Sequence, residues 1–147
     1  MSTLPIRPRR QPPIQLTSLG VRVAVPTEPS ILTLETFPNP MMEYPSSSVT
    51  IESERDEFTC LCPVTGQPDF GKIRIVYTPN EKCVESKSLK LYLQSYRNEK
   101  IFHEAVIARI ATDFIEVVDP AELEITGYFS PRGGLSFQPT ITWQNDD

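Results

Sequence analysis

The side chains best suited to chemistry lie in one stretch, Phe58-Thr-Cys-Leu-Cys-Pro-Val-Thr-Gly-Gln-Pro-Asp-Phe70. Within it, Asp69 follows Cys62 by seven residues, and Pro63 biases Cys62 toward an extended backbone. A thiolate in an activating environment is a nucleophile, and the charge that develops on the group it attacks needs a proton donor. Cys62 and Asp69 could therefore perform nucleophilic catalysis. The alternative is a small buried thiol and an Asp that organises a turn.

A second stretch, Cys83-Val-Glu-Ser-Lys-Ser-Leu-Lys-Leu-Tyr-Leu93, places hydroxyl and ammonium groups near the start of an expected helix. Phosphates favour helix N-termini because unpaired N–H groups and the helix dipole point at them. Lys87 and Lys90 are therefore candidates for phosphate contacts. The same pattern also fits a capped amphipathic helix whose lysines face solvent.

Two shorter motifs also combine polar groups. His103 is the chain's single histidine and is followed at once by Glu104. A buried carboxylate there could accept two hydrogen bonds from the N–H edge of a guanine-like ring, although the pair could also be exposed in a first helical turn. In Pro131-Arg-Gly-Gly134, Arg132 could bind a phosphate through two N–H groups, or lie exposed in a hairpin turn.

Hydrophobic periodicity predicts the elements that would carry these residues. It indicates strands at about 48–58 and 72–77, helices over 89–96 and 102–117, and strands over 122–129 and 137–143. The order ββααββ predicts an α+β fold, an antiparallel sheet with a helix pair on one face. The other face of the sheet would be exposed to solvent or covered by another subunit. Assembly of subunits would also pair the two open edges of the sheet. We therefore expect oligomerisation.

Length and composition limit the class of protein. The 147 residues suit one domain over 16–147, preceded by a flexible proline-rich arm over 1–15, since nine of the fifteen prolines lie in the first 45 residues. The net charge of −5 argues against nucleic-acid binding by phosphate neutralisation. No apolar run approaches the roughly 20 residues of a membrane span, and no secretory signal is evident. We expect a cytoplasmic protein.

The cysteines do not suggest a disulfide framework or a metal site. Cys60, Cys62 and Cys83 are odd in number, which fits free thiols in a reducing compartment. A structural zinc site usually takes four Cys or His ligands, and here three cysteines and one histidine would all have to converge. We expect no bound metal.

Taken together and in this order, the motifs resemble the QueF family, the nitrile reductases of the queuosine pathway. The segments that carry the resemblance are Leu61-Cys-Pro-Val-Thr-Gly-Gln-Pro-Asp-Phe70, Val84-Glu-Ser-Lys-Ser-Leu-Lys-Leu-Tyr-Leu93, Phe102-His-Glu104 and Pro131-Arg-Gly-Gly134. The likeness is strong from Phe58 to Gly134 and weaker from about Leu16. It implies the short, single-domain branch of that family.

The resemblance implies a tunnelling fold whose sheets join into a barrel, in stacked rings of a homo-oligomer with active sites between subunits. It implies reduction of the nitrile of 7-cyano-7-deazaguanine to the aminomethyl group of 7-aminomethyl-7-deazaguanine, with two NADPH, in queuosine tRNA-modification biosynthesis. Direct binding of nucleic acid or membrane is not expected.

The resemblance also assigns roles to residues. Cys62 would form a covalent thioimide with the nitrile carbon, and Asp69 would protonate the nitrile nitrogen. Substrate contacts would come from five residues, Val84, Glu85, Ser86, His103 and Glu104. Our own candidates for contacts with the NADPH phosphates are Lys87, Lys90 and Arg132. The chain has no Rossmann glycine fingerprint, so NADPH would have to be held in another way.

Two other classes of protein remain to be separated from this one. A zinc-dependent cyclohydrolase of the same fold that acts on GTP would use several histidines, whereas this chain has only His103. A purine- or pterin-binding module without activity, or an interaction protein that uses its N-terminal arm, would bind its ligand without turnover. A bound metal would favour the hydrolase, and nitrile binding without NADPH oxidation would favour the module.

Overall fold

The computed structural model describes residues 16–17, 20 and 22–146. Its main sheet has five antiparallel strands. The strands are β2 (Val49–Glu52), β3 (Phe58–Leu61), β4 (Pro68–Thr78), β6 (Glu122–Phe129) and β7 (Thr140–Gln144). Their order is β2-β4-β6-β7, and β3 pairs with β4. The arm expected at 1–15 lies outside the described residues.

The strand predicted over 48–58 is wrong in its extent, because it is two strands. β2 pairs with the second half of β4, where Val49 lies opposite Tyr77. β3 pairs with the first half, where Phe58 lies opposite Gly71. The residues between them, 53–57, are all polar and have no apolar side chain to bury, so the ladder is interrupted there. The eleven-residue β4 spans both partners and is the central strand.

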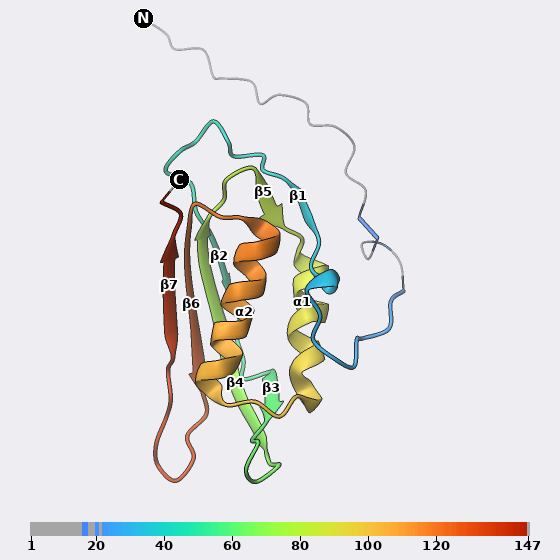
Figure 1. Ribbon diagram of the computed structural model, residues 1–147, viewed down its shortest axis with the longest axis vertical. Helices are drawn as coiled ribbons and strands as arrows, with labels where there is room; N and C mark the ends of the chain where they lie inside the picture. The colour runs from blue at the N-terminus through green and yellow to red at the C-terminus, as the bar shows by residue number, and fades with distance from the viewer. Residues whose placement is uncertain (1–15, 18–19, 21, 147) are drawn as a thin grey trace, which may run out of the picture.

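Two helices cover one face of this sheet, as Figure 1 shows. They are α1 (Ser86–Gln94), continued by the 3₁₀ turn η2 (Ser95–Asn98), and α2 (His103–Val118). Asp119 ends α2 in the left-handed conformation, with a φ of 51°, directly before Pro120. The predicted helix pair and the α+β class are confirmed. No helix in the described part of the chain is long and apolar enough to cross a bilayer.

A small second sheet was not predicted. β1 (Thr36–Pro38) pairs with β5 (Lys82–Val84), and the 3₁₀ turn η1 (Ile31–Thr33) precedes β1. Three-residue strands are too short to show an alternating pattern, which explains why periodicity missed them. This sheet leads directly into α1 and fixes where that helix begins.

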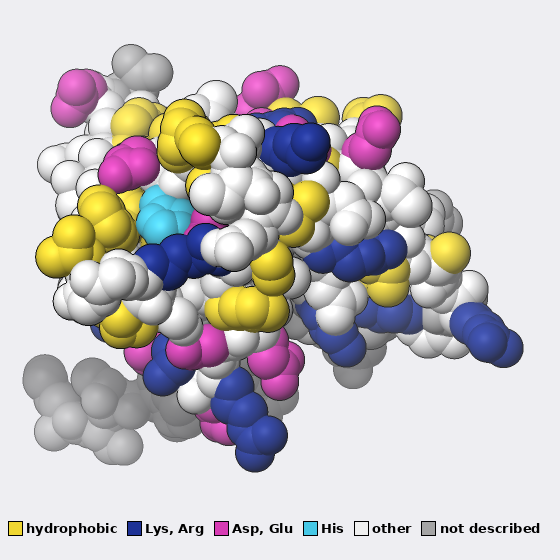
Figure 2. Space-filling view, turned by 90° about the horizontal axis from the view of Figure 1, so that it is seen from below, with side chains coloured by type: hydrophobic (Ala, Val, Ile, Leu, Met, Phe, Trp, Pro, Cys, Tyr) yellow, Lys and Arg dark blue, Asp and Glu magenta, His cyan; other side chains and the backbone are white. Residues whose placement is uncertain are grey.

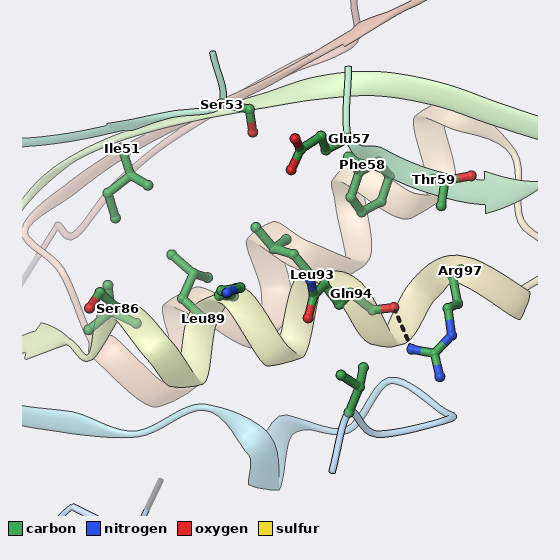
Figure 3. A pocket seen from close by; sticks show the side chains of 13 residues that line it. Ile51, Ser53, Glu57, Phe58, Thr59, Ser86, Leu89, Leu93, Gln94 and Arg97 are labelled. Atoms are coloured by element: carbon green, nitrogen blue, oxygen red, sulfur yellow. Dashed lines mark hydrogen bonds between the residues drawn. The ribbon is translucent and has the colours of Figure 1, made fainter. Parts of the chain in front are cut away.

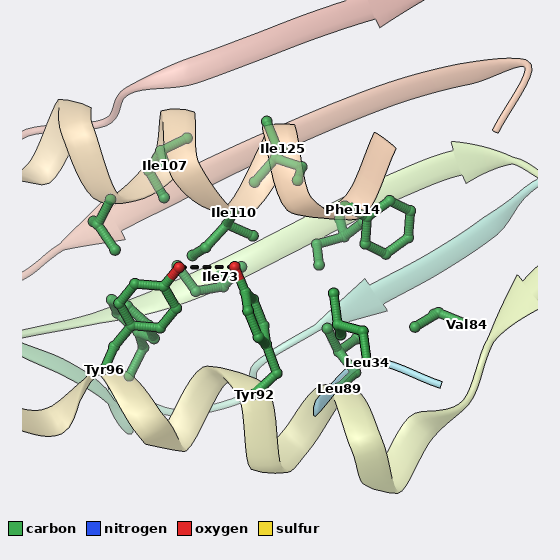
Figure 4. Close-up of a cluster of buried hydrophobic side chains, with 14 of the residues drawn as sticks. Leu34, Ile73, Val84, Leu89, Tyr92, Tyr96, Ile107, Ile110, Phe114 and Ile125 are labelled. Atoms are coloured by element: carbon green, nitrogen blue, oxygen red, sulfur yellow. Dashed lines mark hydrogen bonds between the residues drawn. The ribbon is translucent and has the colours of Figure 1, made fainter. Parts of the chain in front are cut away.

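The core lies between the helices and the sheet (Figure 4). Tyr92 and Tyr96 of the α1–η2 segment lie 2.7 Å apart at their hydroxyl oxygens, and Tyr92 donates to Asp113 of α2 at 2.6 Å. Burial raises the pKa of Tyr92, and it raises the pKa of Tyr96 to about 12, so both hydroxyls stay protonated and available as donors. Hydrogen bonds and apolar packing thus hold α1 and α2 together.

Three segments meet at one end of this layered structure, the lower end in Figure 1. They are the β3–β4 loop, the β6–β7 connection and the first turn of α2. Backbone hydrogen bonds tie the end of β3 to the α1–α2 connection, since Leu61 N donates to Glu99 O at 2.9 Å and Ile101 N donates to Leu61 O at 3.0 Å. This end of the sheet is therefore a rigid platform for whatever its loops carry.

Candidate active site

Cys62 lies in a closed loop directly after β3. Its N–H donates to Gln67 O at 2.8 Å, and its own carbonyl accepts from Gly66 N at 2.8 Å. Gly66 has a φ of +70°, a left-handed conformation that favours glycine and lets the chain turn back into β4. The thiol is half-buried, so the loop fixes its backbone while leaving the sulfur accessible.

The surroundings of Cys62 favour its thiolate form. The pKa of Cys62 is lowered first by a hydrogen bond from the Thr65 hydroxyl, and then by the backbone N–H groups of Thr65 and Val64. Partial burial and the nearby Asp69 act in the opposite direction. Because a thiolate is the reactive form of a cysteine, the loop itself favours a reactive Cys62. Sequence reasoning missed Thr65, although hydroxyls in tight loops often bond to nearby groups.

Cys60, two residues earlier, has the opposite environment. Its side chain is fully buried, and burial raises its pKa to about 12, with Asp69 as the second cause. Cys83 is also buried, and burial raises its pKa as well. Of the three cysteines, only Cys62 therefore combines access with a favoured thiolate.

Asp69 is the buried polar centre of the site, and its two oxygens face different partners. Oδ1 lies 2.7 Å from Nε of Arg132. Oδ2 lies 3.3 Å from Nε2 of His103, although the angle does not make a hydrogen bond and leaves this buried nitrogen without one among the described residues. An unsatisfied buried nitrogen is costly, so it marks a place where a ligand atom could bond.

Two aromatic rings and the first turn of α2 hold His103. Its ring stacks on Phe129 of β6, with centroids 4.0 Å apart and planes 10° from parallel. Phe137 packs against it at 5.6 Å and a 58° tilt. The ring can therefore present Nε2 only toward Asp69 and the space beside it. Figure 2 looks onto this end of the molecule, where the histidine lies among hydrophobic, basic and acidic side chains.

One cavity of about 240 Å³ joins five of the residues singled out from the sequence. They are Cys62, Asp69, His103, Glu104 and Arg132, and the wall also includes Phe102, Ser130, Leu135 and Phe137. A thiol, a carboxylate, an imidazole and a guanidinium thus share one space. This arrangement is capable of covalent catalysis with proton transfer.

Glu104 lies at the rim of this cavity and is exposed. The ring-recognition role expected for it needs a buried carboxylate, which the single chain does not provide. Phe102 and Leu135, also at the rim, are 56% and 65% exposed. A covering surface or a bound ring would be needed to bury this carboxylate.

The other expected substrate contacts lie on a different surface. Val84 and Glu85 are buried and Ser86 is exposed where α1 begins. Glu85 is the N-cap of α1, since its Oε1 accepts from Lys87 N at 2.8 Å and its Oε2 accepts from Ser88 N at 2.7 Å. Sequence reasoning missed this cap because Glu is not among the usual N-cap residues.

A groove of about 560 Å³ runs along α1 beside β2 and β3 (Figure 3). Ile51, Leu89 and Leu93 supply apolar side chains to it, and Val84, Ser86 and Lys90 also line it. Lys90 is exposed and Lys87 is half-buried. The two lysines named as phosphate contacts therefore lie on α1, whereas Arg132 lies in the cavity.

The Arg132 guanidinium already bonds to protein acceptors. Besides Asp69, it donates through Nη1 to Gln67 Oε1 at 3.1 Å and through Nη2 to the carbonyl of Pro68. Any contact with a cofactor would have to use its remaining N–H directions. Among the described residues, no group of three or more His, Cys, Asp or Glu side chains is placed to hold a metal ion.

Comparison with known proteins gives this site its context. The family model described as "QueF-like protein" matches residues 68–147. The "NADPH-dependent 7-cyano-7-deazaguanine reductase" of Anaeromyxobacter sp. (strain K) is 53% identical over 111 residues, which cover 76% of this chain and 88% of that protein. This chain belongs to the QueF family.

A second relative supports membership of the QueF family, and a solved structure shares the fold. The protein of the same name from Helicobacter pylori (strain HPAG1) is 46% identical over 132 residues, 90% of this chain and 87% of that one. The crystal structure of "the archaeosine synthase QueF-Like in the apo form" superposes with a TM-score of 0.60 over 65% of this chain and 92% of that one. At 20% identity, this last likeness concerns the fold alone.

Proposed function

We propose that this chain reduces the nitrile of 7-cyano-7-deazaguanine to the aminomethyl group of 7-aminomethyl-7-deazaguanine with two NADPH, as an enzyme of queuosine biosynthesis. The names of relatives at 46% and 53% identity support this reaction. The observation that carries the mechanism is the cavity in which the Cys62 thiol, with its lowered pKa, shares space with Asp69 and His103.

The first step in this proposal is addition of the Cys62 thiol to the nitrile. The S–C bond forms, one π bond of the C≡N group breaks, and the nitrogen gains a proton from Asp69. This proton originates from the Cys62 thiol, which transfers it to Asp69 as the sulfur attacks, so no proton is gained or lost overall and the step neither oxidises nor reduces the substrate. His103 Nε2, 3.3 Å from Asp69 Oδ2, is placed to return a proton to this carboxylate or to donate directly to the substrate.

The thioimide made in this way accepts hydride more readily than a nitrile does. Each of two NADPH molecules, bound in turn, would supply one hydride, and the S–C bond would break between the two transfers to release the Cys62 thiol. The protein supplies orientation, protons and protection from water. Lys87 and Lys90 suit the NADPH phosphates in charge and in position near the N-terminus of α1. Arg132 can contribute there only through N–H groups that its protein acceptors leave over.

We also propose the tunnelling fold, with sheets of neighbouring subunits joined into a barrel and rings of subunits stacked on one another. β7 pairs with β6 on one side, while β2 and β3 share the opposite border of the sheet, so both borders are open to pairing in the described chain. A subunit that brings its groove, with Val84 and Ser86 in its wall and Glu85 between them, to another subunit's cavity would complete the substrate site and bury Glu104.

The direct test follows NADPH oxidation by its absorbance, with purified protein and 7-cyano-7-deazaguanine. Oxidation of two NADPH per nitrile is expected, with none in Cys62→Ala. Cys60→Ala is the matched control, because it removes a buried thiol two residues away that has a raised pKa and should remain active. Activity of Cys62→Ala within about tenfold of the wild type would exclude covalent catalysis by this thiol.

A second outcome would change the class of protein. Wild-type protein that binds the nitrile but never oxidises NADPH would be a binding module rather than a reductase. An activity that depends on added zinc and releases ammonia or formate from a purine nucleotide would favour the hydrolase class instead.

A further inference from the structure

Arg132 is the first residue of a tight turn, Arg132–Leu135, that fixes the direction of its side chain. Arg132 N donates to Leu135 O at 2.9 Å, and Leu135 N donates to Arg132 O at 3.0 Å. The two residues between them, Gly133 and Gly134, have φ values of 57° and 79°. A two-residue hairpin turn with both central residues left-handed is the tight type I′ turn, which glycine favours. The backbone at Arg132 is therefore fixed.

The three acceptors of its guanidinium lie on three consecutive residues, Gln67, Pro68 and Asp69. These residues close the Cys62 loop and begin β4. The carbonyl of Gln67 in turn accepts the hydrogen bond from Cys62 N at 2.8 Å. Arg132 thus connects the β6–β7 turn both to the carboxylate of Asp69 and to the loop that carries the nucleophile.

The contact with Asp69 also selects which carboxylate oxygen faces the cavity. Nε of Arg132 occupies Oδ1 at 2.7 Å, and Oδ2 is left on the side of His103 at 3.3 Å. The terminal torsion of an Asp side chain is broad, so without this partner the carboxylate could turn. The Asp69 side chain is only 7% exposed, so few other groups could take over this role.

We infer that Arg132 is a positioning residue for the first chemical step, holding the Asp69 carboxylate and the Cys62 loop in the geometry for thiol addition to the nitrile. This inference rests on the proposed function. A positioning role for Arg132 and a contact of Arg132 with an NADPH phosphate would affect different steps of the reaction. Thiol addition is redox-neutral and needs no NADPH, whereas loss of a phosphate contact would change only steps in which NADPH takes part.

The test measures adduct formation in the absence of NADPH. Protein is mixed rapidly with 7-cyano-7-deazaguanine, and the covalent adduct is followed by absorbance and confirmed by intact mass. In Arg132→Ala we expect adduct formation to slow by about a hundredfold, the scale for a misplaced reacting group. The dissociation constant of the nitrile, measured in a Cys62→Ala background, and the KM for NADPH should stay within about twofold of their starting values.

Three further samples sharpen this result. Arg132→Lys keeps a positive charge but cannot reach three acceptors with a planar fork, so it should remain slow and also serves if Arg132→Ala fails to fold. Guanidinium ion at non-denaturing concentration should restore part of the rate of Arg132→Ala, and ammonium ion at the same concentration should not. Arg55→Ala, which removes an exposed guanidinium from the β2–β3 loop, should match the wild type.

Adduct formation at the wild-type rate in both Arg132 variants would overturn the positioning role, most directly if the KM for NADPH rose at the same time. Absence of an adduct in the wild type is a different result. It would overturn the thioimide mechanism itself, together with any role for Arg132 within that mechanism.

Discussion

The cavity at the end of the sheet and the groove along α1 are built in different ways. In the cavity, Asp69 contacts His103 at 3.3 Å and Arg132 at 2.7 Å, so side chains from three segments fix one another within a single chain. The groove is larger, about 560 Å³ against about 240 Å³, and its polar side chains, such as Ser86 and Lys90, are exposed. The cavity has the groups needed for chemistry, whereas the groove offers a surface to another molecule.

This difference explains why the expected site residues fall on two surfaces of one chain. The residues proposed to react with the nitrile are held in place within one chain, which limits the reorganisation needed during the reaction. Those expected to hold the ring and the cofactor are divided between the two surfaces. In the proposed assembly, a complete site combines the cavity of one subunit with the groove of another, and this part of the proposal can be tested most directly.

The largest effect should come from mixing two inactive variants. Cys62→Ala damages the cavity, and Ser86→Trp fills the groove with a bulky ring. If each site combines two subunits, a randomly mixed oligomer should recover about a quarter of wild-type activity, because one in four sites pairs two intact halves. The measurement is NADPH oxidation by the co-assembled protein against each variant alone.

The matched control for this experiment mixes Cys62→Ala with Asp69→Asn. Both substitutions damage the cavity, so no mixed site has two intact halves and no activity should return. Equal recovery in the two mixtures, or none in the first, would contradict a site shared between subunits. Either result would mean that the groove along α1 is not part of the site that contains Cys62.

A smaller effect is expected from Glu104→Gln, which changes the cavity rim. The amide keeps the size of the side chain but replaces one acceptor with a donor, which leaves an N–H group of the ring unpaired. The loss of binding free energy should be about 1–3 kcal/mol. Calorimetric titration of the nitrile into the Cys62→Ala background measures this without covalent bond formation.

Glu116→Gln is a suitable control for that variant, since Glu116 is exposed on the same helix but far along from the cavity. Its dissociation constant should match that of the parent. An unchanged constant in Glu104→Gln would show that this carboxylate does not recognise the ring.

Periodicity was sufficient for the central elements of the fold. Ile73, Ile75 and Tyr77 alternate in the sequence and are buried on one face of β4, and α2 runs over His103–Val118 against an expected 102–117. It failed where strands are short, as in β1 and β5, and where one strand is interrupted, between β2 and β3. In those places pairing is decided by contacts distant in the sequence and not by a local pattern.

The motifs indicated the site residues but not their contacts. Cys62 and Asp69 share a motif, whereas Arg132 reaches Asp69 because β4 and β6 pair with Gly71 opposite Phe129. This register brings the first residues of β4 next to the segment after β6, and no property of either segment alone predicts it. The capping role of Glu85 was missed for a different reason: its partners, Lys87 N and Ser88 N, are local, but Glu is not among the usual N-cap residues.

A third prediction concerns the stability of the groove. Glu85→Ala removes the cap that accepts from Lys87 N and Ser88 N, and should lower the free energy of unfolding by about 1 kcal/mol. Urea unfolding followed by circular dichroism measures this change. Glu81→Ala, an exposed acid just before β5, should leave the midpoint unchanged. Equal stability of wild type and Glu85→Ala would show that the cap does not hold this end of the groove.

The smallest effect concerns the Cys62 thiol, whose pKa is lowered first by the Thr65 hydroxyl. A lowered pKa means that the thiolate is present at a lower pH than in an ordinary cysteine, so removing the donor in Thr65→Ala should move the midpoint of alkylation by iodoacetamide to higher pH. Thr65→Ser keeps the hydroxyl and should keep the wild-type midpoint.

The shift in Thr65→Ala should be partial, because the backbone N–H groups of Thr65 and Val64 still favour the thiolate. Peptide mapping is expected to find the label on Cys62 and not on Cys60, whose burial raises its pKa to about 12. A midpoint that does not move would assign the activation to the backbone alone. The backbone conformation of the loop would then determine the pKa of the Cys62 thiol, and any side chain that preserved this conformation could replace Thr65.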